Sequence, residues 1–314
     1  MADPQSLDYD PTNHQLKKNK GWRIWWKLLR PHTLTAAFIP VLVGTSLALS
    51  FGTVDFPVFL AMLVASLLIQ AATNMFNEYY DFKRGLDTEA SVGIGGTIVR
   101  DGVRAETVLK LAFGFLATAI LLGIYICIQS SWWLAAIGLI CMAAGYFYTG
   151  GPYPIAYTPF GEFTSGLFMG LIIVLISFFI QTGKVTPESI LISIPIAVLI
   201  GGILLANNIR DLDGDKDKGR QTLAILLGRP KAITLLSAMF IFSYLWISAL
   251  ILLGIASPWL LFVLASIPKA IQATRLFRGK TISIQMMPAM KATAQMQTLF
   301  GALLTLGLIV DHLI

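Results

Sequence analysis

The sequence predicts an all-α integral membrane protein with nine transmembrane helices. Of the 314 residues, 56% are hydrophobic and only 13% are charged, and the mean hydropathy of +0.73 lies above the range of soluble globular domains. Hydrophobic runs long enough to cross a bilayer recur along almost the whole chain. The basic residues gather between alternate runs, as expected when every second connection is cytoplasmic.

The predicted organisation is a polar tail followed by one transmembrane domain. Residues 1–20 are polar and contain prolines, so we expect a disordered tail and no cleavable signal peptide. Residues 21–314 are expected to form the single domain. Directly before the first span, the tryptophans of residues 22–26 alternate with basic residues, which is typical of an amphipathic helix at the membrane surface.

The charge distribution orients the predicted spans. We expect transmembrane helices at residues 33–51, 56–73, 108–128, 132–149, 160–181, 189–206, 232–253, 257–274 and 292–312. If the N-terminus is cytoplasmic, Lys184 is the one basic residue among 23 that falls on the outer side. We therefore expect a multi-pass protein of the cell membrane, with the N-terminus and the long loops in the cytoplasm and the C-terminus outside. The net charge of +6 follows from this orientation and does not indicate nucleic-acid binding.

The cysteines and histidines predict no metal or disulfide chemistry. Cys127 and Cys141 lie inside predicted spans, where a role as small buried side chains is expected. The histidines are scattered along the chain, which makes a histidine metal site or triad unexpected.

Two acidic clusters interrupt the hydrophobic sequence with the same spacing. The first cluster contains Asn77, Asp81, Gly85 and Thr88, and the second contains Asp211, Asp215, Gly219 and Thr222. The clusters end the second and the sixth predicted spans, which predicts a parallel internal repeat of two four-helix units followed by a ninth helix. The repeat would bring both clusters to one membrane face, opposite each other across a central cavity. The alternative is that both are ordinary helix ends at the interface, which leaves their matched spacing unexplained.

Helical spacing places each cluster on one helix face. The first stripe is Asn74, Asn77 and Asp81, followed by Asp87 beyond a glycine that we expect to end the helix, and the second stripe is Asn207, Asp211 and Asp215. Polar side chains at this depth are costly unless they face a cavity or one another. All the donors are oxygen atoms, so the stripes predict Mg²⁺ as the bound cation. The second cluster is not a calcium-binding EF-hand, because its glycine and its last residue do not fit that loop.

Basic residues accompany both clusters and predict a phosphorylated substrate. They are Lys83, Arg84, Arg100, Arg210, Lys216, Lys218 and Arg220. Membrane orientation alone accounts for part of this charge, and the residues beside the acidic ligands, Lys83, Arg84 and Arg210, are the better candidates for diphosphate contacts. The GIGG sequence at residues 93–96 lacks the context of a phosphate-binding loop; we expect a flexible loop there, with a backbone contact to phosphate as the alternative. A diphosphate at the mouth of an apolar cavity implies a lipid-tailed substrate, whose departing pyrophosphate starts carbocation chemistry.

The inner loop between the fourth and fifth spans is rich in Tyr, Gly and Pro and contains no basic residue. Tyr146, Tyr148, Tyr153 and Tyr157 are available there to shield a carbocation, since an aromatic face attracts positive charge. An aromatic belt at the membrane interface is the alternative interpretation.

The sequences NMFNEYYDFKRGLD, NNIRDLDGDKDKGRQTLA and LLRPHT together resemble the UbiA superfamily of intramembrane aromatic prenyltransferases, over essentially the whole chain after residue 20. The forms GGTIVRDG and YYDFKRGLD resemble the branch that prenylates 1,4-dihydroxy-2-naphthoate in menaquinone biosynthesis. The resemblance implies a UbiA-like bundle of nine helices in which Mg²⁺ bridges the two Asp motifs and a polyprenyl diphosphate.

The spacing and the resemblance together suggest roles for individual residues. The metal ligands would be Asn74, Asn77, Asp81, Asp87, Asp211 and Asp215, and the catalytic residues would be these four aspartates with Tyr148. The substrate-binding residues would be Arg30, Lys83, Arg84, Arg100, Thr149, Tyr153, Asn207, Arg210 and Lys218. The first motif departs from the family pattern, because Glu78 and Gly85 stand where Asp is usual, and Asp87 would substitute for the second of these.

The expected activity is transfer of an all-trans polyprenyl group to 1,4-dihydroxy-2-naphthoate, with loss of the ring carboxylate as CO₂. Enzymes of this family that act on 4-hydroxybenzoate carry a Lys-Arg pair after the fourth span, whereas this chain has Pro154 and Ile155 there. The alternatives are another aromatic acceptor (homogentisate, 4-hydroxybenzoate or a vitamin K precursor) or a secondary transporter, whose polar residues should lie near the bilayer centre. A cation channel would instead be expected to form a symmetric oligomer. The expected partners are the two substrates and membrane lipid, and the sequence leaves the oligomeric state open.

Overall fold

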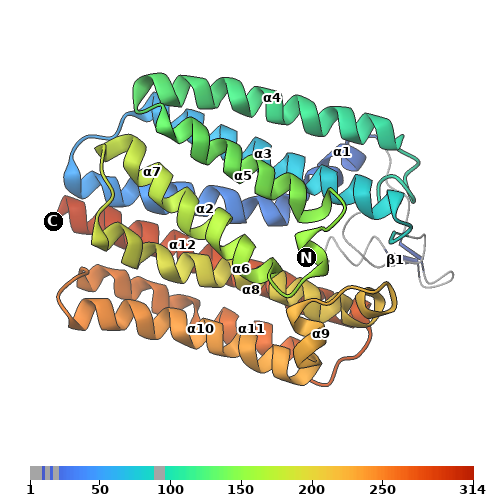
Figure 1. Ribbon diagram of the computed structural model, residues 1–314. Coiled ribbons are helices and arrows are strands. Elements are labelled where there is room, and N and C mark those ends of the chain that lie inside the picture. The colour runs from blue at the N-terminus through green and yellow to red at the C-terminus, as the bar shows by residue number, and fades with distance from the viewer. Residues whose placement is uncertain (1–8, 11–14, 17–20, 88–95) are drawn as a thin grey trace.

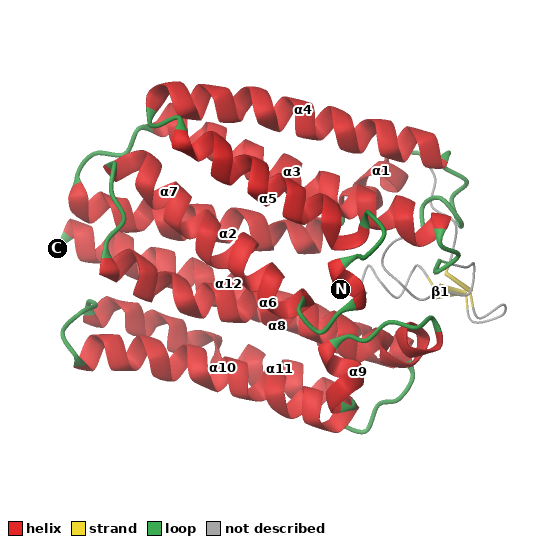
Figure 2. Ribbon diagram, in the orientation of Figure 1, coloured by secondary structure: helices red, strands yellow, loops and turns green. Residues whose placement is uncertain are grey.

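The hydrophobic runs form long helices that lie side by side along a common direction (Figure 1). The structure is a computed structural model that describes residues 9–10, 15–16, 21–87 and 96–314. Within these residues, eight helices are long and apolar enough to cross a membrane, and a shorter apolar helix makes the ninth predicted span. The prediction of an all-α, multi-pass membrane protein is confirmed (Figure 2).

The helices of the bundle are α2 (Pro31–Ala48), α3 (Phe56–Lys83), α4 (Ala105–Gln129), α5 (Trp133–Thr149), α6 (Gly161–Ser165) with η3 (Gly166–Ile172) and α7 (Ile173–Thr182), α8 (Pro187–Asp217), α10 (Arg229–Leu252), η4 (Pro258–Ser266) with α11 (Ile267–Phe277), and α12 (Ser283–Leu313). The shorter elements are the helices α1 (Trp22–Leu29), η1 (Leu49–Phe51), η2 (Ile155–Tyr157) and α9 (Leu223–Leu227), and the strands β1 (Tyr9–Asp10) and β2 (Gln15–Leu16). The two strands form one short antiparallel pair. Most of the predicted tail lies outside the described residues, so the division at residue 20 stays a prediction.

Three helices extend far beyond the hydrophobic runs that predict them. Helix α3 continues past Asp81 to Lys83, α8 continues past Asp215 to Asp217, and α12 begins at Ser283, before the predicted start at residue 292. Hydropathy falls at the first charged residues, but backbone hydrogen bonds within a helix do not depend on the solvent outside it. Each stripe of Asn and Asp side chains therefore lies on a continuous helix, as its spacing predicts.

The two helices that carry the clusters begin with capped first turns. The Asp55 side chain accepts a hydrogen bond from the Val58 amide at 3.0 Å at the start of α3. At the start of α8, Thr186 and Ser189 form a reciprocal capping box, with Pro187 in the first turn. These caps fix the N-terminal ends, and the site lies at the opposite ends of the same helices.

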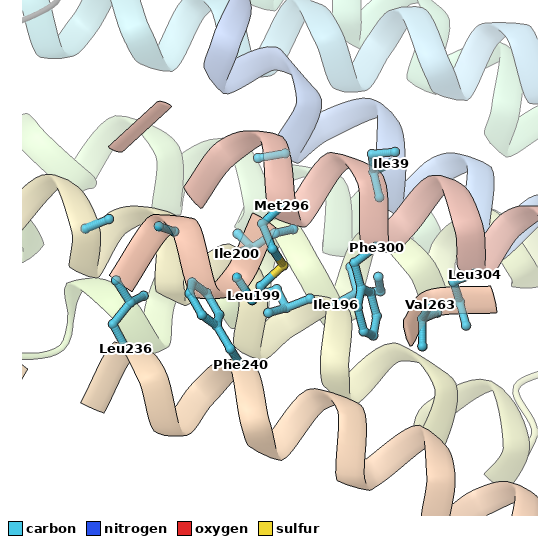
Figure 3. Close-up of a cluster of buried hydrophobic side chains, with 14 of the residues drawn as sticks. Ile39, Ile196, Leu199, Ile200, Leu236, Phe240, Val263, Met296, Phe300 and Leu304 are labelled. Atoms are coloured by element: carbon cyan, nitrogen blue, oxygen red, sulfur yellow. The ribbon is translucent and has the colours of Figure 1, made fainter. Parts of the chain in front are cut away.

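The core is made of apolar side chains from α2, α8, α10, η4 and α12 (Figure 3). Glycines let two pairs of helical segments pack closely, η3 with α8 and α12 with α2, as is common in membrane proteins. A Cβ atom at Gly170 in η3 would collide with the backbone of Ala197 in α8, and one at Gly301 in α12 would collide with the side chain of Ile39 in α2. η3 is a π-helical segment, a form often found beside functional sites.

Helix α1 lies at one end of the bundle, near the loops (Figure 1). Its Leu28 is buried in a cluster with Met75 and Phe76 of α3, while its three tryptophans are exposed. The predicted amphipathic helix is therefore present. Arg30, between α1 and α2, has a φ of 51° and is the one non-glycine residue with positive φ in the described chain.

The C-terminal ends of α3 and α8 lie at the same end of the bundle, whereas the C-terminus of the chain lies at the other end (Figure 1). The Lys218 ammonium donates to the carbonyl of Leu86, which ties the connection after α8 to the one after α3. Gly85 and Gly219 both have positive φ, 67° and 78°, and occupy matching places in the two clusters. Thr88, the last position of the first cluster, lies outside the described residues.

Candidate active site

A cavity of about 670 Å³ runs between the helices, with a polar mouth and an apolar interior. The polar side chains at its mouth are Arg30, Asn74, Asn77, Asp81, Asp87, Asn207, Arg210, Asp211, Asp215, Lys218 and Arg220. The apolar lining comes from α3, α4, α5, η3, α7 and α8. Asp81 and Met62 of α3 both line it, and at about 1.5 Å per residue they lie about 28 Å apart along the helix. The cavity is therefore nearly as deep as the hydrocarbon core of a bilayer, about 30 Å.

One side of this cavity is not sealed by other helices. Ile120 and Ile124 of α4 and Leu139 of α5 line it, yet their side chains are 42%, 41% and 59% exposed. In a membrane, lipid would cover these side chains.

Arg220 joins the two acidic clusters at the mouth. Its Nη2 lies 2.7 Å from Oδ1 of Asp81, and its Nη1 lies 3.0 Å from Oδ1 of Asp215. Because one guanidinium reaches both carboxylates, the ends of α3 and α8 face each other across the cavity, as the predicted repeat requires.

Asp211 and Asn207 are held by Arg210 from the same helix. The Arg210 guanidinium lies 2.5 and 2.7 Å from the two carboxylate oxygens of Asp211 and 2.7 Å from Oδ1 of Asn207. It is buried and also contacts the sulfur of Met290 at 2.8 Å. Arg210, predicted to bind diphosphate, therefore lines the cavity with its donors directed at protein groups.

The two asparagines of the first stripe have different partners. Oδ1 of Asn77 accepts a hydrogen bond from the hydroxyl of Thr149 at 2.7 Å, so Thr149 orients this amide. The Nδ2 group of Asn74 donates to the Leu29 carbonyl at 3.0 Å and to the Thr33 hydroxyl at 2.9 Å. Asn74 lines the cavity, but its amide also ties α3 to the end of α1 and the start of α2.

Glu78 organises the loop after α3 and was not among the predicted site residues. Its Oε1 accepts hydrogen bonds from the Gly96 amide at 2.7 Å, the Thr97 hydroxyl at 3.0 Å and the Ile98 amide at 3.2 Å. Its Oε2 lies 3.3 Å from Nη2 of Arg30. A glutamate inside a hydrophobic helix, next to Asn77, is the sequence signal for this role. Residues 93–95 of the GIGG sequence lie outside the described chain, so a phosphate contact there stays untested.

Asp87 lies at the mouth, close to two other carboxylates. Burial, together with the nearby carboxylates of Asp81 and Glu78, raises the pKa of Asp87 to about 6, although Arg30 and Lys218 act in the opposite direction. A cation bound at the mouth would relieve this repulsion, so the oxygen donor set fits a hard divalent metal. Across the described residues, however, no three Asp, Glu, His or Cys side chains converge on one point. The arginines explain this: Asp81 and Asp215 are paired with Arg220, and Asp211 is paired with Arg210.

Three basic residues that were expected to bind the substrate do not line the cavity. Lys83 is exposed, with its Nζ 5.7 Å from the ring centre of Tyr79. Arg84 donates to the carbonyls of Thr149 and Gly151 at the end of α5. Arg100 is buried in the loop before α4. The structure brings none of the three into the cavity.

The tyrosines of the inner loop also differ in position. Tyr148 lines the cavity, whereas Tyr153 is 91% exposed and lies away from it. The hydroxyl of Tyr146 is 2.6 Å from that of Tyr80. The ring of Tyr157 has the guanidinium of Arg220 5.2 Å from its centre. Of the four tyrosines predicted to shield a carbocation, Tyr148 is the one that lines the cavity.

The sequence profile of the UbiA prenyltransferase family matches residues 37–308. The chain belongs to this family. The resemblance stated from the motifs is therefore confirmed, and this UbiA family member is a prenyltransferase by class.

Relatives of this UbiA family member share most of its length. A protein of Bacillus subtilis (strain 168) named 1,4-dihydroxy-2-naphthoate octaprenyltransferase is 58% identical over 296 residues, covering 94% of this chain and 95% of the relative. One of the same name from Mycobacterium tuberculosis (strain ATCC 25618 / H37Rv) is 31% identical over 273 residues, covering 86% and 91%.

A solved structure shares the fold. It is that of a UbiA homologue from Archaeoglobus fulgidus bound to DMAPP and Mg²⁺, with a TM-score of 0.59, 16% sequence identity, and coverage of 89% of this chain and 98% of that one. At this identity the likeness concerns the fold alone.

Proposed function

We propose that this chain transfers a polyprenyl group from its diphosphate to 1,4-dihydroxy-2-naphthoate, in the pathway to menaquinone. One observation carries the proposal: two facing acidic helix ends form the mouth of an apolar cavity that is nearly as deep as the bilayer core. A charged head group fits the mouth and a long hydrocarbon chain fits the interior. The name of the 58% identical relative supports this acceptor.

The reaction forms one carbon–carbon bond and releases diphosphate and CO₂. The diphosphate leaves the first carbon of the prenyl chain with the bonding electron pair, and the ring carbon that bears the carboxylate attacks this allylic cation. Loss of that carboxylate as CO₂ returns the electrons to the ring and gives the reduced form of demethylmenaquinone. The apolar walls of the cavity would keep water from the cation, and the ring of Tyr148, which lines the cavity, would stabilise it.

Mg²⁺ is the proposed cofactor. Asp81, Asp87, Asp211 and Asp215 would hold it, with Asn77 as a neutral oxygen ligand, since all five line the mouth. When bound, Mg²⁺ neutralises the diphosphate and makes it a better leaving group. The archaeal UbiA homologue that binds DMAPP and Mg²⁺ supports this choice of metal.

The orientation in the membrane is part of the proposal. With the mouth in the cytoplasm, all basic residues except Lys184 lie on the cytoplasmic side, and the C-terminus lies outside. Soluble substrates would then reach the site from the cytoplasm.

An acceptor panel tests the proposed activity. The purified chain is incubated in detergent with Mg²⁺, radiolabelled octaprenyl diphosphate and one of 1,4-dihydroxy-2-naphthoate, 4-hydroxybenzoate or homogentisate. We expect a labelled lipid product with the naphthoate alone, together with one CO₂ released for each prenyl group transferred. Product from 4-hydroxybenzoate or homogentisate alone would show that the proposed acceptor is wrong.

A further inference from the structure

Arg220 occupies the place between the two clusters where a bound cation would lie. It belongs to the short connection between α8 and α9, and its guanidinium bridges Asp81 and Asp215, 139 residues and 5 residues away in sequence. The Tyr157 ring lies against the guanidinium at 5.2 Å. A single positive side chain thus neutralises one carboxylate from each cluster.

The backbone at Arg220 is fixed, so its side chain is the part that can turn. The Arg220 amide donates to the carbonyl of Asp215 at 3.0 Å, and the next amide, of Gln221, donates to the carbonyl of Tyr157 at 2.9 Å. Its Nε is buried with no hydrogen-bond partner, which leaves a donor unused while the two Nη groups are bound to carboxylates. Arg220 also lines the cavity, so a ligand at the mouth is within its reach.

A guanidinium and a divalent metal compete for the same pair of carboxylates. Arg220 contacts Oδ1 of two proposed metal ligands, Asp81 and Asp215, so a metal that draws both carboxylates to itself weakens the hold of the guanidinium. A displaced guanidinium is costly unless it finds another anion, and its planar fork suits the oxygens of a diphosphate. The metal replaces the guanidinium as the cation beside the two aspartates, and the diphosphate replaces the aspartates as the anion beside the guanidinium. Metal alone leaves the guanidinium without an anionic partner.

We propose that Arg220 is a positioning residue that changes partners: it holds Asp81 and Asp215 together in the free protein and turns to the diphosphate when the substrate and its metal bind. This inference rests on the proposed function, because it takes the metal and the diphosphate as ligands. Metal binding and diphosphate binding are coupled, since each favours the arrangement of Arg220 that the other needs.

Equilibrium dialysis of the full chain in detergent tests the coupling. Protein-bound radiolabelled Mn²⁺ is measured with and without inorganic pyrophosphate, for the unmodified protein and for Arg220→Gln. Removing the competing guanidinium should make Mn²⁺ alone bind about ten-fold more tightly, a typical size for coupling between sites. The same variant should lose the gain in Mn²⁺ affinity that pyrophosphate gives the unmodified protein. A merely structural role for Arg220 would weaken Mn²⁺ binding instead.

Arg229→Gln is the matched control. Arg229 is also ion-paired to an aspartate of α8, at 2.9 Å from Asp213, but this pair lies outside the cavity, so both Mn²⁺ affinities should stay unchanged. If Arg220→Gln does not fold, Arg220→Lys keeps the charge without the fork and should show a smaller gain with pyrophosphate. Equal or weaker Mn²⁺ binding by Arg220→Gln without pyrophosphate would overturn the role of Arg220 and leave the metal site intact. No Mn²⁺ binding by the unmodified protein in either condition would overturn the proposed metal site and this inference together.

Discussion

Asp211 and Asp213 lie two positions apart on α8 but face different surroundings. Asp211 lines the cavity, whereas Asp213 is 66% exposed and is paired with Arg229. The pair therefore separates the effect of a carboxylate at the mouth from that of negative charge at this end of the bundle.

Asp211→Asn is expected to lower the rate of prenyl transfer by more than about 100-fold. Loss of a group that only hydrogen-bonds to a metal ligand already lowers metal affinity or activity by about 10- to 100-fold, and loss of a ligand itself should cost more. The Mg²⁺ concentration that gives the half-maximal rate should rise at the same time. The measurement is the rate of labelled product formation across a series of Mg²⁺ concentrations. Asp213→Asn should leave both quantities unchanged, and an equal loss in the two variants would contradict the metal role of Asp211.

At this scale the sequence predicts which residues share a face, but not their partners. The spacing of Asp81, Asp211 and Asp215 identifies the polar mouth, since residues on one helix keep a fixed angular relation. The bridge from Arg220 to Asp81 crosses 139 residues, and the bond from the Gly96 amide to Glu78 crosses 18. Such pairs depend on how helices and loops meet, which no local spacing contains. Lys83 and Arg84, two and three positions after Asp81, lie outside the cavity lining for the same reason.

Helix α3 runs along the cavity from its mouth to its deep end. Ala65 lines the apolar part, about 24 Å from Asp81 along the helix at about 1.5 Å per residue. Leu60 lies on the same helix, is 47% exposed and does not line the cavity. A larger side chain at these two positions should have different effects on long substrates.

Ala65→Phe is expected to shorten the prenyl chain that the cavity accepts. The added ring fills space that the tail of a long substrate needs, so kcat/KM for octaprenyl diphosphate should fall by about ten-fold or more. Geranyl diphosphate, which ends before this depth, should react as well as with the unmodified protein. Steady-state rates with the two donors give the comparison. Leu60→Phe should change neither rate; an equal loss with both donors in Ala65→Phe would mean that the tail does not occupy this region.

Element type and number follow from hydropathy, whereas element ends do not. The ends of α3 and α8 lie beyond the hydrophobic runs because helical hydrogen bonds continue into the polar layer. The π-helical turn of η3 has no local sequence signal of its own. The need for glycine in η3 becomes clear only from its packing against α8, where Ala197 leaves no room for a Cβ at Gly170.

For the whole molecule, the charge distribution predicts which end faces the cytoplasm. Lys184 lies in the connection between α7 and α8, and Lys280 lies in the one between α11 and α12, and both are exposed. They fall on opposite sides of the membrane in the proposed orientation.

Single cysteines at these positions test the orientation, in a protein whose Cys127 and Cys141 are replaced by Ala. A membrane-impermeant maleimide added to intact cells should label Lys184→Cys and not Lys280→Cys, because only the first would face outward. Permeabilised cells should label both, which controls for reactivity. Labelling of Lys280→Cys alone in intact cells would reverse the orientation and place the cavity mouth outside.

The unsealed side of the cavity, along α4 and α5, has a kinetic consequence. Because Ile120, Ile124 and Leu139 are exposed beside the substrate space, a polyprenyl chain can enter and leave within the plane of the bilayer. The donor and the product then never pass through water, and the quantity that saturates the enzyme is the mole fraction of donor among the lipids. A KM for the donor expressed per litre of suspension has no fixed value, since added lipid dilutes the substrate without changing the volume.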